Sequence, residues 1–266
     1  MAEQRIETRL YLAADLTPGA ELRLDPARAH FLRSVLRLEA GARLAAFNAR
    51  DGEWLARIEG LGKGWCAIRI ETPRRAPEPE PDLWLVFAPI KRAHIDFLAA
   101  KATELACSVL QPVMTRRTAV ARVNCERLAA NAREAAEQCG RLSVPEVREP
   151  LELGALIAGW PAERRLLLCA ETGPARPIAE ALSAVAAEDE GSVAPWAAPW
   201  AVMTGPEGGL TESELDALRN LPFVTLVSLG PRVLRSDTAA LAALACWQAV
   251  LGDGRRRPPA RAPQPV

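Results

Sequence analysis

A proline-rich segment divides this 266-residue chain into two stretches of different sequence texture. Four prolines fall within Pro73–Pro81. Proline lacks the backbone N–H group that a helix or a β-ladder needs, and several prolines together favour an extended spacer. We therefore predict a domain at residues 1–75, a linker at 76–81, a second domain at 82–252 and a disordered basic tail at 253–266.

The first stretch has the pattern of a small β-barrel. Short β-prone pieces are separated by glycine-containing turns such as Arg50-Asp51-Gly52. Between the first two pieces, apolar residues of Ala29–Leu38 recur at helical spacing with arginines between them, which predicts a helix. The predicted strands are Arg9–Leu12, Ala42–Asn48, Glu53–Glu59 and Trp65–Glu71.

The second stretch alternates predicted strands with predicted helices. This order is typical of an α/β domain, in which helices cover a mostly parallel sheet. The segment 187–199 is predicted to be a surface insertion. The predicted strands are Leu83–Ala88, Val109–Val113, Arg165–Cys169, Trp200–Thr204 and Val224–Leu229, and the predicted helices are Ile95–Ala106, Asn124–Gly140, Ala179–Ala187, Glu212–Asn220 and Thr238–Leu251.

Composition narrows the functional classes. No apolar run is long enough to cross a bilayer, and the first residues lack the apolar stretch of a signal peptide, so we expect a cytoplasmic protein with no membrane partner. Six widely spaced cysteines and two histidines offer no zinc framework, so we expect reduced thiols and no metal.

The formal net charge is zero, but the charges are unevenly distributed. Basic residues outnumber acidic ones by thirteen to ten over residues 1–75, by ten to seven over 91–150 and by six to two over 231–266. These regions are candidates for contact with phosphates, although a solvated surface explains the same pattern.

Two glycine-containing loops follow predicted strands. The first, Met203–Thr211, holds Gly205, Gly208 and Gly209, and the second, Val227–Leu241, contains Gly230. Glycines at strand ends let backbone groups approach a ligand, and two neighbouring loops of this kind can form one pocket. The first loop lacks both the GK[ST] and the GxGxxG patterns, and its Glu207 would repel a pyrophosphate.

Ordinary structural roles explain parts of both loops. Thr211 and Glu214 have the spacing of a capping box, and Asp237 is placed where a residue could cap the last helix.

The residues in these loops resemble one family. Thr204–Gly209 together with Leu229–Ala239 is similar to the signature of the RsmE family of ribosomal RNA uridine-N3 methyltransferases, in the SPOUT superfamily. Three further blocks, His30–Arg37, Lys101–Leu105 and Glu134–Arg141, match the family in the same order. Asp237 and Ala106 depart from it, since family members usually have Glu and Gly there.

This resemblance implies a PUA-like β-barrel that helps to hold RNA, then an α/β domain with a C-terminal trefoil knot that binds S-adenosylmethionine. It also implies a homodimer that methylates N3 of a uridine in 16S ribosomal RNA, with the assembled small subunit as substrate. The cofactor residues expected from the resemblance are Leu168, Glu171, Thr204, Gly205, Pro206, Glu207, Gly208, Gly209, Ser228, Leu229, Gly230, Val233, Leu234, Thr238 and Ala239.

The chemistry suggests roles for charged residues. Uracil N3 carries a proton, so we expect Glu207 or Asp237 to accept it and Arg232 and Arg235 to bind phosphate or stabilise the uracil anion. From the barrel, we expect RNA contacts by the arginines Arg9, Arg33 and Arg37. Two alternatives remain open: a knotted methyltransferase with another RNA target, such as transfer RNA or a ribose oxygen, and a non-catalytic RNA-binding protein.

Overall fold

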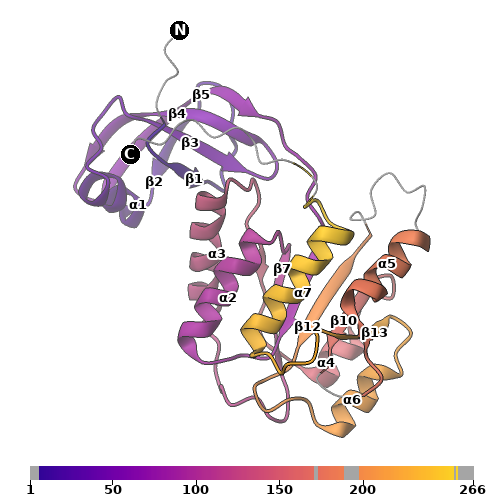
Figure 1. The fold of residues 1–266 in the computed structure, drawn as a ribbon. Coiled ribbons are helices and arrows are strands. Elements are labelled where there is room, and N and C mark those ends of the chain that lie inside the picture. Colours follow the sequence, from indigo (N-terminus) through magenta and orange to yellow (C-terminus); the bar gives the residue numbers. More distant parts are fainter. Residues whose placement is uncertain (1–5, 171–172, 189–197, 255, 257–266) are drawn as a thin grey trace. The chain divides into compact units, whose positions relative to one another are not determined.

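The structure is a computed structural model that describes residues 6–170, 173–188, 198–254 and 256 (Figure 1). These residues fall into two compact units. The first holds the residues up to Pro79 together with Ala136–Val144, and the second holds Glu80–Ala135 and the residues from Pro145 onward.

The first unit is built on a curved sheet in the order β1-β3-β4-β5-β2. The pair β1–β3 is parallel and the other pairs are antiparallel. The four predicted strands are present, but β2 was not predicted, because its four residues include only two apolar ones. The bounds are β1 Arg9–Tyr11, β2 Glu21–Leu24, β3 Arg43–Asn48, β4 Gly52–Gly62 and β5 Trp65–Arg75.

The helical part of this unit begins earlier and ends earlier than predicted. Helix α1 (Pro26–His30) starts three residues before the predicted start, because Asp25 caps it and Pro26 has the backbone angle of a first helical turn. The chain continues as a π-helical turn, η1 (Phe31–Val35), in which the Leu36 amide donates to the Phe31 carbonyl at 3.0 Å.

The turn before β4 needs its glycine. Gly52 has φ +80°, and a Cβ atom there would lie 2.2 Å from the Arg75 carbonyl oxygen. No other residue type fits this position without moving β5, so the predicted Arg50-Asp51-Gly52 turn also sets how closely the ends of β4 and β5 approach.

The described part of the second unit contains a sheet in the order β11-β13-β10-β12-β6-β7-β8, with β9 also paired to β7. Every strand pair in it is parallel, as predicted. The bounds are β6 Leu83–Phe87, β7 Val109–Met114, β8 Glu146–Val147, β9 Leu151–Glu152, β10 Arg165–Cys169, β11 Arg176–Pro177, β12 Trp200–Thr204 and β13 Val224–Ser228.

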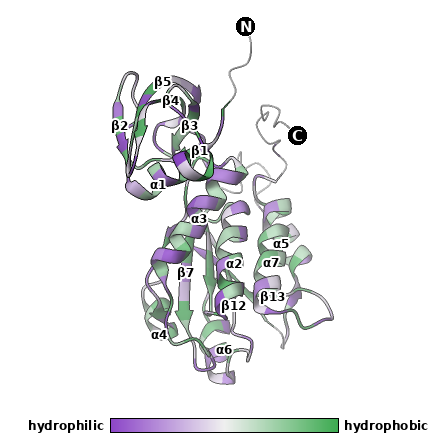
Figure 2. Ribbon diagram, turned by 90° about the vertical axis from the view of Figure 1, so that its left-hand side faces the viewer, coloured by the Kyte–Doolittle hydropathy of each residue, from purple (hydrophilic) through white to green (hydrophobic). Residues whose placement is uncertain are grey.

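Helices cover both faces of this sheet (Figure 1). Trp200 and Val202 of β12 pack with α2, α5 and α7 on one face, while Ala201 and Met203 pack with α4 and α6 on the other. Both faces are therefore buried, and Figure 2 shows the apolar strands lying between the helices. The helix bounds are α2 Arg92–Glu104, α3 Cys125–Cys139, α4 Leu153–Ala158, α5 Ile178–Glu188, α6 Glu212–Arg219 and α7 Ser236–Val250.

Short elements account for the differences from the predicted order. The strands β8, β9 and β11 have two residues each and α4 has six, which is too short for a periodic pattern to reveal. Most of the predicted insertion at 187–199 and of the predicted tail at 253–266 lies outside the described residues. The start of that tail is ordered by hydrogen bonds, because the amides of Asp253 and Gly254 donate to Gln248.

Three further findings concern membrane helices, metal sites and cysteines in the described residues. No helix there is long and apolar enough to cross a membrane. Within the same residues, no three His, Cys, Asp or Glu side chains gather as a metal site would require. All six cysteines are free thiols.

Helix α2 ends in an unusual conformation for its sequence. Ala106 has φ +61°, a left-handed conformation that costs an L-residue about 1–2 kcal/mol. The Cys107 amide donates to the Ala102 carbonyl and the Ala106 amide donates to the Thr103 carbonyl, the two bonds of a Schellman cap. A glycine, the residue expected at this position from the family that the sequence resembles, would take this conformation without strain.

We expect Ala106→Gly to raise the free energy of unfolding by about 0.5–1 kcal/mol, because relief of strain exceeds the extra entropy of the unfolded chain. Ala100→Gly, in the interior of the same helix, is the matched control and should lower it by about 0.5–1 kcal/mol. Urea or thermal unfolding measures both. Destabilisation by both substitutions would contradict the strain at Ala106.

Candidate functional site

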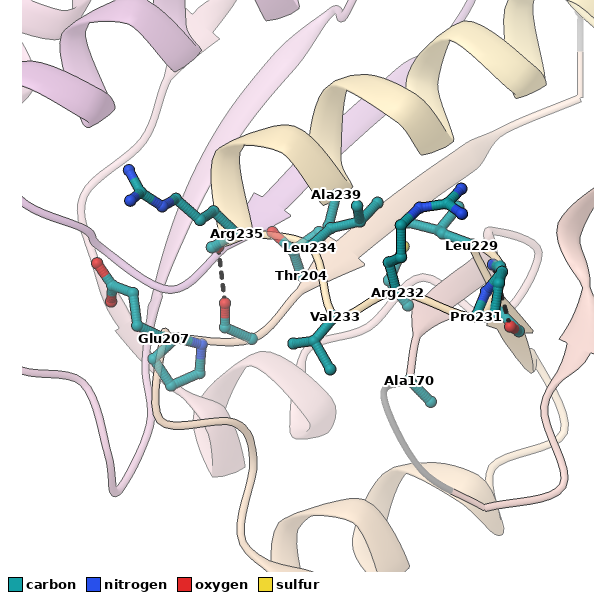
Figure 3. A pocket seen from close by; sticks show the side chains of 16 residues that line it. Ala170, Thr204, Glu207, Leu229, Pro231, Arg232, Val233, Leu234, Arg235 and Ala239 are labelled. Atoms are coloured by element: carbon teal, nitrogen blue, oxygen red, sulfur yellow. Dashed lines mark hydrogen bonds between the residues drawn. The ribbon is translucent and has the colours of Figure 1, made fainter.

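A cavity of about 390 Å³ opens at the carboxyl ends of three neighbouring strands, β10, β12 and β13 (Figure 3). The start of α7 closes one side. Ligands of open parallel sheets bind at such edges, and pockets for small molecules start at about 300 Å³. The lining residues are Cys169, Ala170, Thr204, Gly205, Pro206, Glu207, Ser228, Leu229, Gly230, Pro231, Arg232, Val233, Leu234, Arg235, Ser236 and Ala239.

Strand register explains why the two glycine loops meet. Strand β10 pairs in parallel with β12 on one side and with β13 on the other. The loops that follow β12 and β13 therefore leave the sheet at the same edge, two strands apart. Leu168 opposes Met203 in one pair and Leu226 in the other. The chain segments that follow these three residues therefore lie close together.

Two hydrogen bonds fix the loops. The Ser236 hydroxyl donates to the Gly205 carbonyl oxygen at 2.8 Å, and joins the start of α7 to the loop after β12. The Gly230 amide donates to Ser228 Oγ at 3.3 Å, in a turn where Gly230 has φ +104°. Because Ser236 is buried, its bond is shielded from water and holds the two loops at a fixed separation.

The first loop also leads into a capped helix, as its sequence predicts. Thr211 Oγ1 accepts from the Glu214 amide, and the Glu214 carboxylate accepts from the Thr211 amide, which completes the capping box. Glu214 is buried. Although burial raises its pKa, hydrogen bonds from the Arg116 and Thr211 amides lower that pKa below the ordinary value, so the carboxylate remains charged.

The pocket wall combines apolar side chains with polar backbone. Leu229, Leu234 and Ala239 supply apolar surface. In the described structure, the backbone amides of residues 232–235 have no hydrogen-bond partner, so they are free to bind a ligand. Figure 3 shows Arg235 on the same side of the lining as Glu207 and Arg232 on the side of Pro231, with Val233 between the two arginines. Val233 is 81% exposed.

The thiol in the wall is inert. Burial, together with a smaller contribution from neighbouring Cys246, raises the pKa of the Cys169 thiol to about 12. A protonated thiol is a poor nucleophile. The site therefore offers backbone groups, a carboxylate and two guanidinium groups for its chemistry.

Most of the predicted cofactor residues meet in this cavity, but not all. Leu168 is fully buried in the core, and Gly208, Gly209 and Thr238 do not line the cavity. Glu171 lies outside the described residues. Cys169, Ala170 and Pro231 also line the cavity and lie within Leu168–Glu171 and Ser228–Leu234, two of the segments onto which the resemblance maps the donor pocket. Ser236 was not predicted, although it directly follows Arg235.

Of the four predicted catalytic residues, Glu207, Arg232 and Arg235 line the cavity and Asp237 does not. Asp237 is also not the helix cap, since that position is Arg235. Its Oδ2 lies 2.8 Å from His94 Nδ1 of α2. Burial raises the pKa of Asp237, but hydrogen bonds from His94 and the Thr238 amide outweigh this and lower the pKa, which makes Asp237 a weak base.

The three predicted RNA-binding arginines have different surroundings. Arg33 and Arg37 are exposed around η1, beside the exposed apolar side chains of Phe31 and Val35. Arg9 is the exception. Its guanidinium donates to Glu53 and to three backbone carbonyls, those of Ala136, Glu137 and Arg141, so four of its five N–H groups are already engaged within the protein.

The chain matches known proteins along most of its length. The family described as RNA methyltransferase domain matches residues 77–248, and the family described as RNA methyltransferase PUA domain matches residues 24–71. A ribosomal RNA small subunit methyltransferase E from Synechocystis sp. is 31% identical over 91% of this chain and 78% of its own length. The chain belongs to the ribosomal RNA small subunit methyltransferase E family.

Further relatives support this membership. The methyltransferase E of Rickettsia conorii is 29% identical over 89% of this chain and 93% of its own length. The crystal structure of the methyltransferase E of Neisseria gonorrhoeae, which is bound to S-adenosyl methionine, matches with a TM-score of 0.78 and 26% identity over 92% of this chain and 98% of that one. The family resemblance noted in the sequence is thereby confirmed.

In this methyltransferase E family member, substitution of Ser236 tests how much its hydrogen bond to Gly205 contributes to stability. We expect Ser236→Ala to lower the free energy of unfolding by about 1–2 kcal/mol, because it leaves a carbonyl without its buried partner, and to speed hydrogen exchange in both loops. Ser213→Ala, on the exposed start of α6, is the control and should change stability by less than about 0.5 kcal/mol. Equal effects of the two substitutions would contradict the role of Ser236.

Proposed function

We propose that this protein transfers a methyl group from S-adenosylmethionine to N3 of a uridine in 16S ribosomal RNA, with the assembled small subunit as substrate. The observation that carries the proposal is the cavity at the ends of β10, β12 and β13, in a chain whose fold matches a relative with S-adenosyl methionine bound. The matches to RNA methyltransferase and PUA domains support RNA as the substrate.

The cavity fits this cofactor by size and by chemistry. A volume of about 390 Å³ suits a nucleoside with an amino-acid arm, and the apolar surface of Leu229 and Leu234 suits an adenine ring. The unpaired amides of residues 232–235 are donors for ring nitrogens or a carboxylate. The Glu207 carboxylate suits a ligand that carries positive charge.

When bound, S-adenosylmethionine supplies a methyl group already activated on a sulfonium sulfur. The protein then has to orient the acceptor and remove its proton. We assign proton removal to Glu207, because it lines the cavity and Asp237 does not. The N3 proton passes to the Glu207 carboxylate. With the cofactor bound, the freed N3 electron pair would form the bond to the methyl carbon as the carbon–sulfur bond breaks, and the electron pair of that bond would stay on the sulfur, which becomes a neutral thioether. Arg232 and Arg235 stabilise the negative charge that develops on the uracil.

Asp237 has a positioning role in this scheme. Its pair with His94 joins α2 to the first turn of α7, directly after Arg235. The shorter acid at this position still reaches the histidine, at 2.8 Å. We infer that the pair holds the Arg235 backbone in place.

The first unit provides RNA contacts. Arg33 and Arg37 are exposed cations, and the neighbouring Phe31 is 39% exposed, which suits stacking on an unpaired base. Three other expectations stay predictions for this chain: the homodimer and the trefoil knot, which the family resemblance implies, and the cytoplasmic location, which the composition suggested.

One experiment tests the proposed function directly. Small ribosomal subunits from a strain without the enzyme are incubated with the protein and labelled S-adenosylmethionine, and the nucleosides are separated by mass spectrometry. We expect 3-methyluridine, with a strong reverse-transcriptase stop at one site, because an N3 methyl blocks pairing. Large subunits and transfer RNA serve as controls. A label on a ribose, or on transfer RNA alone, would contradict the proposal.

A second experiment tests the base. We expect Glu207→Gln to lower kcat by about 100-fold or more, because general-base catalysis is lost, while affinity for S-adenosylmethionine changes by only a few-fold. Asp237→Asn is the matched carboxylate control and should retain turnover to within about 10-fold. Near-full turnover of Glu207→Gln with cofactor bound, or a larger loss in Asp237→Asn, would refute this assignment.

A further inference from the structure

A second cavity, of about 320 Å³, lies in the α/β unit and is separate from the first in its lining residues. Its apolar floor consists of Ile90, Ile95 and Leu128, which are 2%, 7% and 2% exposed. Three arginines, Arg92, Arg122 and Arg127, also line it, and Asp96 is its single acidic residue. A buried apolar floor with a cationic rim is suited to a ligand that is flat and apolar at one end and anionic at the other.

The charges of the rim are not balanced within the protein. Asp96 is paired with Arg127 and accepts a further hydrogen bond from Asn131 Nδ2 at 3.1 Å. Arg92 and Arg122 are exposed and have no ion pair or side-chain hydrogen bond among the described residues. The cavity therefore keeps two cations available for an external anion.

The loop between β7 and α3 connects the two cavities. Val120, Arg122 and Val123 of this loop line the second cavity. Earlier in the same loop, the Arg117 side chain donates to the Gly208 carbonyl at 2.9 Å and the Arg116 amide donates to Glu214 at 2.8 Å. Gly208 and Glu214 belong to the loop and helix that follow β12, so this basic loop joins the second cavity to the methyl-donor site.

The second cavity also opens at the same edge of the sheet. Ile90 and Arg92 follow β6, and β6 pairs in parallel with β12, with Phe87 opposite Thr204. The chain after Phe87 is held there by the Ala88 amide, which donates to the Thr204 carbonyl at 3.2 Å. The two cavities therefore occupy adjacent positions along one row of strand ends.

We propose that the second cavity binds one nucleotide of the RNA strand adjacent to the methylated uridine. Arg92 and Arg122 hold its phosphate, and its base lies on the floor formed by Ile90, Ile95 and Leu128. This inference rests on the proposed function, since it names a substrate subsite beside the donor pocket. The subsite fixes the strand so that a neighbouring base reaches the cofactor.

The test compares Arg92→Gln/Arg122→Gln with the native protein. Binding to unmethylated small subunits is measured over a range of KCl concentrations at constant Mg²⁺, and affinity for S-adenosylmethionine is measured by calorimetry. We expect subunit affinity to fall by about 10-fold or more, with cofactor affinity unchanged. The slope of log affinity against log salt should decrease by about 0.7, because the subsite neutralises one phosphate and each single-strand phosphate contributes about 0.7.

Two further variants show whether the effect belongs to the charges. Arg92→Lys/Arg122→Lys keeps both charges and should retain most of the salt slope. Arg133→Gln removes an exposed charge from α3 outside the cavity and should leave the slope unchanged. An unchanged slope in the double Gln variant, or a parallel loss of cofactor affinity, overturns the subsite. A native protein that binds subunits but yields no methylated nucleoside refutes the proposed function instead, and the salt slopes then still decide whether the cavity binds RNA.

Discussion

The site depends on the parallel pairing of β10 with β12 and β13. In a parallel sheet all strands point the same way, so the chain leaves them at one edge. Because helices cover both faces of the sheet, its backbone amides and carbonyls are exposed to water at that edge. Here the segments after β12 and β13 place Gly205 and Gly230 in the lining, and the backbone itself becomes a wall of the cavity.

Polar contacts made by α7 give this wall its shape. The helix begins at Ser236, whose hydroxyl binds the loop after β12, and its next residue, Asp237, binds His94 of α2. Further along, Trp247 is fully buried and packs edge-on against Trp200 at 6.4 Å between ring centroids. The helix is therefore anchored at both ends, and Arg235, which precedes it, is held at the cavity.

Arg9 serves the first unit in a comparable way. Its guanidinium lies 4.1 Å from the ring centroid of Phe47, pairs with the buried carboxylate of Glu53 and caps carbonyls at the end of α3. The last carbonyls of a helix lack intrahelical partners, and an arginine has enough donors to satisfy several of them. An arginine that looks in sequence like an RNA contact thus becomes a structural cap.

The sequence alone determined the order of the long elements, the change from a β domain to an α/β domain and the two loops that form the site. These features are local, because periodicity, glycine and capping residues act over a few positions, as at Thr211 and Glu214. Only the tertiary structure decided that Asp237 binds His94 instead of the cavity, that Arg9 binds carbonyls of α3, and that a second arginine-lined cavity exists. Each depends on partners far apart in the chain, 143 residues in the case of His94 and Asp237, and no local pattern encodes such a distance.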